Sequence, residues 1–222
     1  MKLAVRTSSG AYGVGLIDAA GALVAVQEGD GSSASPGDLT ATLLRRAGLG
    51  PGDVSGVLVD LGPGGLSATR VGVSFANAFA HGTGARLAGV SALDLQCHQA
   101  RADLPADLPL LSLRPAPGGQ VFWGLCRGTG LAEAGCDRLA DLLPALQARL
   151  GRLAVTGPLA RLRGFDAALP CITPLPVDPP ALAGFAHVPQ RPAICRAGVA
   201  LLEPLTDARA LLAPPTDPEP AR

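Results

Sequence analysis

Short apolar runs alternate with amphipathic stretches along the chain, in an order that predicts an α/β protein. Residues 2–6 have the pattern of a strand. Residues 11–28 have that of a β-hairpin, because two apolar runs flank a small-residue turn at 18–21. A helix is expected to start at residues 35–36, since serine caps helices and proline suits their first position. Residues 57–59 form a short β-branched run that is typical of a buried strand.

A glycine–proline turn at residues 62–65 leads into a second helix, expected over about residues 66–81. Large apolar residues recur there every four positions and therefore share one face: Val71, Phe75 and Phe79. The neighbouring stripe is almost free of bulk and consists of Gly72, Ala76 and Ala80. Such a stripe permits the close approach of another helix.

The remaining pattern predicts a second round of similar elements. Strands are expected at 85–90, 109–115, 119–127 and 152–157, a helix capped by Ser91, a helix over 136–151 that Pro144 should kink or restart, and a last helix within 193–205. Proline is frequent from 170 to 192, so any helix there must be short. We therefore expect two related lobes, residues 1–103 and 104–212, followed by a disordered tail at 213–222.

Charge and composition narrow the class of protein. The 18 basic and 18 acidic residues cancel, which argues against a broad nucleic-acid or anionic-membrane surface. No apolar run is long enough to span a membrane, and the apolar stretch at the N-terminus is too short for a signal peptide. The five cysteines are widely spread, which favours reduced, mostly buried thiols: Cys97, Cys126, Cys136, Cys171 and Cys195. A cytoplasmic protein without a membrane role is expected.

Two glycine-rich stretches are candidates for holding phosphate groups. At Gly62, Pro63 and Gly64 the backbone could approach an anion at a helix start, but no P-loop lysine follows, so a tight strand-to-helix turn is the alternative. In the first hairpin, a nucleotide could contact small residues of the kind that phosphotransfer folds use: Thr7, Ser8, Ser9 and Gly10. However, Arg6 occupies the position where an acidic residue would hold the metal, and a fixed cation cannot do so.

No set of residues suited to catalysis stands out. The three histidines lack metal-ligand spacing with a cysteine, and no nucleophile-elbow motif is present. The carboxylates of Asp94, Asp137 and Asp141 fit helix caps and solvated faces. We therefore expect no catalytic residue, no metal site and no cofactor.

A two-part motif over residues 60–93 resembles the signature of the TsaB (YeaZ) family, which helps to make threonylcarbamoyladenosine in tRNA. The positions in register are Gly62, Pro63, Gly64, Arg70 and Gly72, with Val71 in place of isoleucine, and then Gly89, Val90, Ser91 and Leu93. The chain departs from the family pattern at Arg6, which replaces an aspartate, at residues 65–68 and at 114–120.

The resemblance implies the actin-like ATPase (ribonuclease H-like) fold, an α/β fold of two related lobes with mixed sheets and helices. It also implies a non-catalytic scaffold that binds a TsaD-type enzyme as a heterodimer, with a TsaE-type ATPase as a further candidate partner, and that meets tRNA only through the complex. A homodimer is expected as the alternative when the chain is alone. The expected contact residues are Leu39, Leu43, Val71, Phe75 and Phe79. The glycine–proline turn would set the angle of the second helix, and Arg70 would anchor that turn.

Two other functions remain open from the sequence. One is a small-molecule kinase or phosphotransferase of the same fold, which would bind phosphates at residues 7–10 and 62–65. The other is a degenerate homodimer that has no role in tRNA modification.

Overall fold

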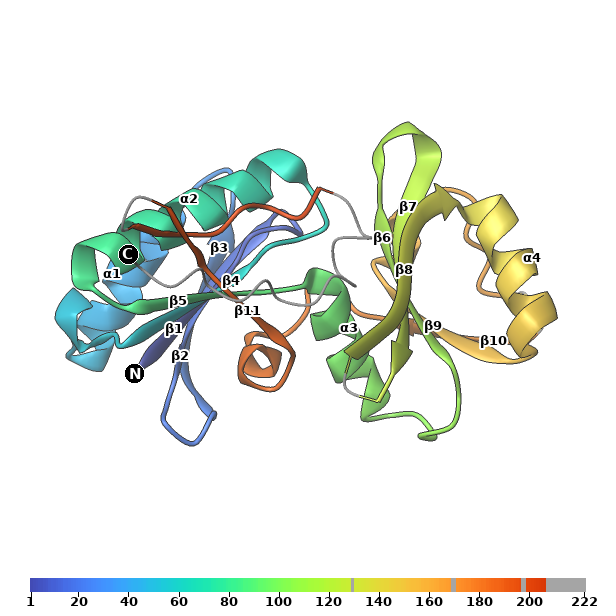
Figure 1. Cartoon of the computed structure of the whole chain (residues 1–222), viewed down its shortest axis with the longest axis horizontal. Coiled ribbons are helices and arrows are strands. Elements are labelled where there is room, and N and C mark those ends of the chain that lie inside the picture. The colour runs from blue at the N-terminus through green and yellow to red at the C-terminus, as the bar shows by residue number, and fades with distance from the viewer. Residues whose placement is uncertain (129, 169–170, 197–198, 207–222) are drawn as a thin grey trace.

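The chain folds into two lobes that lie side by side, each built on its own β-sheet (Figure 1). The computed structural model describes residues 1–128, 130–168, 171–196 and 199–206. Helix α3 (Ala92–Arg101) lies between the two sheets. The predicted disordered tail, residues 213–222, lies outside the described residues.

The N-terminal lobe holds a six-stranded sheet in the order β11-β5-β4-β1-β2-β3. Strands β1 (Lys2–Arg6), β2 (Ala11–Ile17) and β3 (Leu23–Asp30) form an antiparallel meander. Strands β4 (Gly56–Asp60) and β5 (Arg86–Val90) then extend the sheet in parallel from β1. The crossovers are α1 (Pro36–Ala47), followed by the 3-10 turn η1 (Pro51–Asp53), and α2 (Leu66–Thr83).

The C-terminal lobe repeats this topology, with a five-stranded sheet in the order β10-β9-β6-β7-β8. Its antiparallel meander is β6 (Leu110–Pro115), β7 (Gln120–Arg127) and β8 (Gly130–Arg138), with the turn η2 (Pro117–Gly119) between the first two. Helix α4 (Leu139–Leu150) leads to β9 (Leu153–Gly157), and η3 (Leu159–Arg161) to β10 (Ile172–Pro176). Strand β9 pairs in parallel with β6, and β10 pairs in parallel with β9. The two related lobes with mixed sheets are therefore confirmed.

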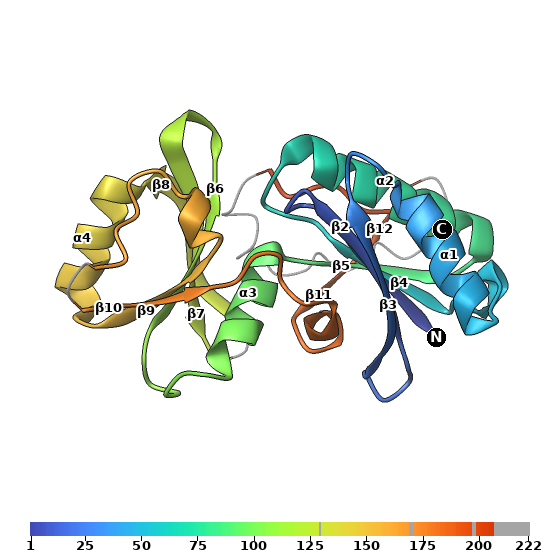
Figure 2. The ribbon, with the colours of Figure 1, turned by 180° about the vertical axis from the view of Figure 1, so that it is seen from behind.

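Each sheet is covered on both faces, as strands with buried residues on each side require. In the first lobe, α1 and α2 cover one face, and the 3-10 turn η4 (Leu182–Ala186) covers the other (Figures 1 and 2). In the second lobe, α4 covers one face and α3 the other. Among the described residues no helix is both long and apolar enough to span a lipid bilayer.

Several predicted elements were wrong near the C-terminus. Residues 136–138 belong to strand β8, so α4 starts later than predicted, and it continues through Pro144. The described residues within 193–205 do not form the predicted helix; β12 (Ile194–Arg196) and β13 (Val199–Leu201) pair instead as antiparallel strands. Short apolar runs do not distinguish a strand from a helix, and here the partner strand decided.

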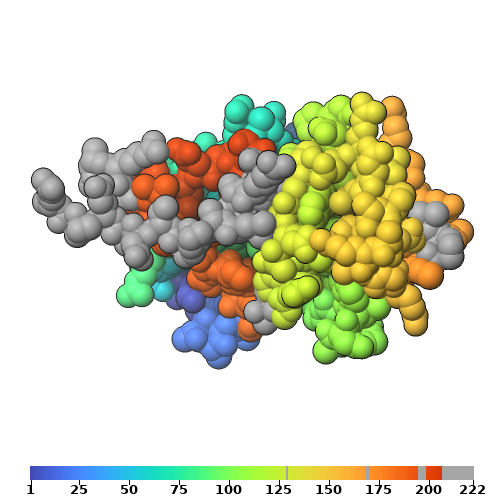
Figure 3. Space-filling model, turned by 45° about the vertical axis from the view of Figure 1, so that its right-hand side comes forward, coloured from blue at the N-terminus to red at the C-terminus, as the bar shows by residue number. Residues whose placement is uncertain are grey.

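The predicted lobe boundary was also too simple. Strand β11 (Gln190–Pro192) pairs with β5 of the first sheet, and Phe185 of η4 is fully buried beneath that sheet. In Figure 3 the orange-red residues of this returning segment lie with the first lobe, whereas yellow α4 covers the second. The first lobe therefore comprises the N-terminal elements together with the described residues between about 182 and 206.

The cysteines differ from the expectation of reduced thiols. Cys97 on α3 and Cys126 on β7 are joined as a disulfide, with their Cα atoms 6.3 Å apart. They are 29 residues apart in the sequence, and only the packing of α3 on the second sheet brings them together. Cys136 and Cys171 are outside this disulfide.

The low-bulk stripe of α2 is buried in the core of its own lobe. Gly72, Ala76 and Ala80 are buried there. A Cβ atom at Gly72 would collide with the side chain of Thr7, which is itself fully buried. The glycine therefore sets how closely α2 approaches the end of β1.

We expect Gly72→Ala to destabilise the protein by about 1–3 kcal/mol, because the new methyl group overpacks a site with no free space. Gly82→Ala is the matched control in the same helix, where a Cβ would meet nothing within 4 Å. It should stabilise by about 0.5–1 kcal/mol through helix propensity. Urea unfolding measures both, and equal effects at the two positions would contradict the packing argument.

A buried carboxylate lies where α3 meets the returning segment. Asp94 is only 6% exposed, and its Oδ1 atom has no hydrogen-bond partner among the described residues. Burial raises the pKa of Asp94 to about 6, although the charge of Arg191 on β11 opposes this. The folded protein therefore holds a proton on Asp94 that the unfolded chain releases at lower pH.

Because the pKa is raised on folding, the contribution of Asp94 to stability is present at pH 4 and is lost as the pH rises to about 6. We expect the free energy of unfolding of the natural protein, relative to Asp94→Asn, to fall by roughly 2–3 kcal/mol over that range. Denaturant unfolding at a series of pH values measures the difference. The same substitution at exposed Asp103 controls for the loss of one negative charge, and a constant difference for Asp94→Asn would refute the prediction.

Candidate functional site

A cleft between the lobes gathers residues from both sheets. The carboxyl ends of β1, β4, β6 and β9 meet there, which is where ligands bind in α/β folds. A cavity of about 410 Å³ opens at this edge. Its walls come from the turn after β1, the start of α2, the end of β6 and the segments after β9 and β10: Ser8, Ser9, Gly10, Gly64, Gly65, Leu66, Ala68, Arg114, Pro115, Ala116, Pro117, Pro158, Arg161 and Asp178.

Asp60, the last residue of β4, ties the first hairpin to the signature turn. Its carboxylate is fully buried and accepts hydrogen bonds from Ser8 N at 3.2 Å, Ser8 Oγ at 2.5 Å and Gly62 N at 2.8 Å. Such charge-assisted bonds are stronger than neutral ones. The two loops that line one side of the cavity are therefore held as a unit.

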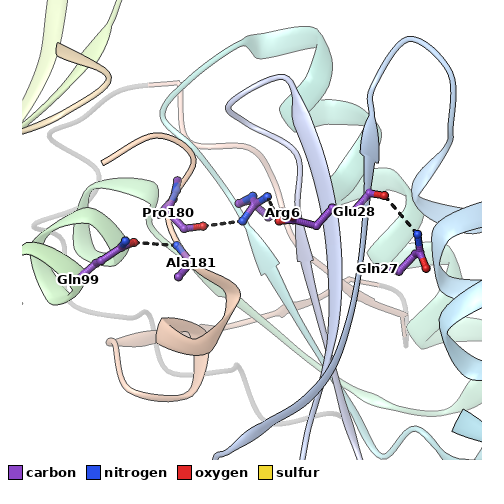
Figure 4. Close-up of polar contacts among 6 residues, drawn as sticks. All are labelled: Arg6, Gln27, Glu28, Gln99, Pro180 and Ala181. Atoms are coloured by element: carbon purple, nitrogen blue, oxygen red, sulfur yellow. Dashed lines mark hydrogen bonds and ion pairs between the residues drawn. The ribbon is translucent and has the colours of Figure 1, made fainter. Parts of the chain in front are cut away.

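Arg6 ends β1 and points toward the second lobe (Figure 4). Its Nη1 donates to the carbonyl oxygen of Pro180 at 2.7 Å, and its Nη2 pairs with Glu28 of β3 at the same distance. Pro180 lies between the lobes, and the neighbouring Ala181 N donates to Gln99 of α3 at 2.8 Å (Figure 4). Arg6 thus anchors the connecting chain at the position where the family pattern has an aspartate.

Arg114, near the end of β6, is the second cation of the cleft. Its side chain lines the cavity, yet the residue is only 2% exposed, and Nε and Nη1 have no hydrogen-bond partner among the described residues. Burial lowers the pKa of Arg114, while the charges of Asp60 and Asp178 act in the opposite direction. An arginine stays charged even so, and the site therefore holds a buried guanidinium with unused donors.

Arg161 of η3 is the third cation and lies at the rim. It pairs with Asp178 at 3.2 Å and donates from Nη1 to the carbonyl oxygen of Ser9 at 3.2 Å. Its side chain is 62% exposed. A second hollow of about 750 Å³ shares Ser9, Gly10 and Arg161 with the first and continues toward Arg6 and Glu28.

The start of α2 forms one wall of the cavity. Gly62 has a φ of 82°, which favours glycine, and Gly65 is an N-cap without a side-chain hydrogen bond. A Cβ at Gly64 would lie 2.6 Å from the Ser8 carbonyl oxygen and 2.9 Å from Arg114 Nη2, so only glycine fits between them. The turn brings the helix start directly against the arginine.

The four residues proposed as nucleotide contacts have different places. Ser9 and Gly10 line the cavity, Ser8 lines it while bonding to Asp60, and Thr7 is buried beneath α2 beside Gly72. Among the described residues, no three His, Cys, Asp or Glu side chains are grouped to hold a metal ion. Arg70, which was expected to anchor the turn, is exposed on α2, and Asp60 accepts a hydrogen bond from the turn at Gly62 N.

The residues proposed as partner contacts differ in how far their side chains are exposed. Leu39 and Leu43 are 5% and 2% exposed in the core of the first lobe, so neither presents its side chain to a partner, contrary to prediction. Val71 is 44% exposed. Phe75 and Phe79 are half-buried, with ring centroids 5.6 Å apart.

Sequence analysis missed the residues that give the cleft its charge: Asp60, Arg114, Arg161 and Asp178. Asp60 ends β4, and Arg161 and Asp178 follow β9 and β10, which was the available signal for these three, because strand ends converge at one edge of a sheet.

The comparisons with known proteins agree on a family. Residues 33–163, more than half of the chain, match the model of the family described as "TsaD: tRNA N6-adenosine threonylcarbamoyltransferase". YeaZ from Pseudomonas aeruginosa has a TM-score of 0.61 at 18% identity, over 84% of this chain and 91% of that one. A structure described as an uncharacterized protein with similarity to peptidase YEAZ, also from Pseudomonas aeruginosa, has a TM-score of 0.65 at the same identity and coverage. No curated protein sequence matches the chain.

The matched span contains the glycine–proline turn, α2 and the β5–Ser91 segment, so it includes the residues on which the resemblance rests. The resemblance is confirmed for the family and for the actin-like, two-lobed fold. The chain therefore belongs to the family of the TsaD model, the tRNA N6-adenosine threonylcarbamoyltransferases, as a divergent member with the fold of YeaZ.

Proposed function

We propose that this chain is a non-catalytic, TsaB-type subunit that binds a TsaD-type enzyme and supports threonylcarbamoylation of the adenosine next to the tRNA anticodon. The observation that carries the proposal is the outward face of α2. A TsaE-type ATPase would join the same assembly, and tRNA would be met through the complex.

The outward face of α2 is small and almost uncharged. Its exposed positions include Ser67, Arg70, Val71, Ser74, Ala78 and His81, which recur at helical spacing, and Leu66 and Gly82 near the helix ends are exposed as well. Short side chains let the axis of a second helix come close, and the exposed Val71 supplies apolar contact. This face fits an antiparallel or crossing helix from a partner.

Both flanks of α2 are occupied, so the helix is held firmly. On one side, Phe75 packs near Gly37 at the start of α1, its ring 3.7 Å from the position of a Cβ there. On the other side, Asn77 exchanges two hydrogen bonds of 3.0 Å with the backbone of Leu202. A preorganised helix face loses little conformational entropy on binding, which favours a docking role.

The charges of the cleft favour a supporting role over phosphotransfer. An arginine stands at the end of β1, and Asp60 is committed to three donors of the protein. Asp178 is paired with Arg161. A kinase of this fold would need free carboxylates to hold Mg²⁺ and a base for its acceptor.

The test is co-expression with the TsaD-type subunit of the same organism, followed by size-exclusion chromatography with light scattering. We expect a one-to-one complex, and Val71→Asp should weaken it by roughly tenfold or more because a charge is buried at the contact. Val26→Asp is the matched control: Val26 is 43% exposed on β3, and its neighbour Ala25 faces the α1 side of the sheet, so Val26 faces the other side.

Loss of binding in both variants, or in neither, would reject the assignment of α2 as the contact. A chain that forms only its own dimer would support the degenerate-homodimer alternative. Saturable binding of magnesium-ATP by calorimetry, together with turnover, would support the phosphotransferase alternative.

A further inference from the structure

The guanidinium of Arg114 is a buried charge without a matching partner. Among the described residues it forms no ion pair. Two carboxylates of the region pair with other arginines, since Glu28 pairs with Arg6 and Asp178 pairs with Arg161. The charges of Asp60 and Asp178 act on Arg114 through space, but both oxygens of Asp60 accept hydrogen bonds from Ser8 and Gly62. A buried charged group with unused N–H donors costs several kcal/mol unless something satisfies it.

A second set of unused donors faces the same cavity. Helix α2 is 18 residues long, its N-cap Gly65 offers no side-chain acceptor, and its first turn contains no acidic residue. The first N–H groups of a helix have no partner within the helix, and the helix dipole makes this end positive. Leu66 and Ala68 of this start line the cavity together with Arg114, whereas the N–H of Gly65 already donates to the carbonyl oxygen of Ser8 at 3.0 Å.

The two sets of donors converge. Gly64 leaves the backbone close enough to Arg114 that a Cβ there would lie 2.9 Å from Nη2. The buried hydroxyl of Ser9, which has no hydrogen-bond partner in the part of the chain that the structure describes, adds another donor to the same wall, and Arg161 closes the rim. Arginine, helix N-terminus and hydroxyl together form the set of donors that recognises a tetrahedral oxyanion.

We infer that the interlobe cleft binds a phosphate-class oxyanion, as inorganic phosphate or as the phosphoryl end of a small monoester, directly on Arg114 and the start of α2 without a divalent cation. The arginines supply the positive charge that a metal would otherwise provide. Asp60 and Asp178 are already bonded to donors of the protein, which leaves them poorly placed to hold a metal. A cavity of about 410 Å³ has room for a small group attached to the phosphate.

This inference does not depend on the proposed role with TsaD, and it is tested on the full chain alone. Inorganic phosphate is titrated by calorimetry into the protein in a buffer with EDTA, at an ionic strength held constant with chloride. Glycerol phosphate is the monoester arm, acetate is the carboxylate arm, and magnesium-ATP is the metal-dependent arm.

The natural protein should bind phosphate saturably at one site in the presence of EDTA. Tighter binding of glycerol phosphate would identify the monoester as the source, and equal or weaker binding would identify free phosphate. Arg114→Gln should lower the affinity roughly tenfold or more, and Arg161→Gln, at the rim, roughly threefold. Arg45→Gln, on the exposed end of α1, is the matched control and should bind as the natural protein does.

The melting temperature separates a ligand-binding arginine from a structural one. Phosphate should raise the melting temperature of the natural protein and of Arg45→Gln, but not that of Arg114→Gln. Without phosphate, Arg114→Gln should be as stable as the natural protein or more so, because an uncompensated charge has been removed.

Several outcomes would overturn the inference. They are the absence of saturable phosphate binding, binding that requires magnesium, a preference for acetate, or an Arg114→Gln variant that is destabilised yet binds phosphate normally. Should Arg114→Gln fail to fold, the natural protein and Arg161→Gln decide the matter, since Arg161 is largely exposed.

Discussion

The buried carboxylate of Asp60 is the contact on which the rest of the structure depends. It joins the end of β4 to the turn after β1 and to the glycine–proline turn through three hydrogen bonds. Since α2 begins directly after that turn, the same bonds fix the direction of the helix. They consequently fix both the outward face of α2 and the place where its start meets the cleft. An exposed carboxylate could not do this, because water would compete for each donor.

The arginines of the cleft follow from this constraint. A backbone held this tightly leaves Gly64 as the residue that lets the helix start and Arg114 approach each other. Arg6 donates a hydrogen bond to the carbonyl oxygen of Pro180, in the chain that returns from the second lobe, and so links the two lobes. Two buried guanidinium groups near one carboxylate are electrostatically unfavourable unless further negative charge arrives. Glu28 provides this negative charge for Arg6, and the cavity leaves room for a negatively charged ligand at Arg114.

Much of the fold could be predicted from the sequence, and the failures have physical causes. The first hairpin, α1 with its Ser35 cap and α2 were predictable because turn residues, capping residues and helical spacing are local signals. Strand β8 and the β12–β13 pair were not, since a short apolar run adopts the structure that its partner imposes. The same limit explains Leu39 and Leu43: periodicity identifies an apolar face but not what covers it. Arg114 was out of reach because its environment arises from four separate segments.

The two lobes share a topology but not their crossovers, and this difference separates their roles. Between β4 and β5 the first lobe has the 18-residue α2, whereas the described residues between β9 and β10 of the second lobe form only the short η3. A helix of that length offers an outward face to a protein and a dipole to the cleft at the same time. A single 3-10 turn offers neither, and its Arg161 side chain supplies charge to the rim instead. The first lobe is therefore the one equipped for a partner, while the anion site needs both lobes, since the helix start comes from one and Arg114 from the other. Any ligand that bridges them would also restrain the angle between the lobes, and with it the position of the returning chain that packs against α2 at Leu202.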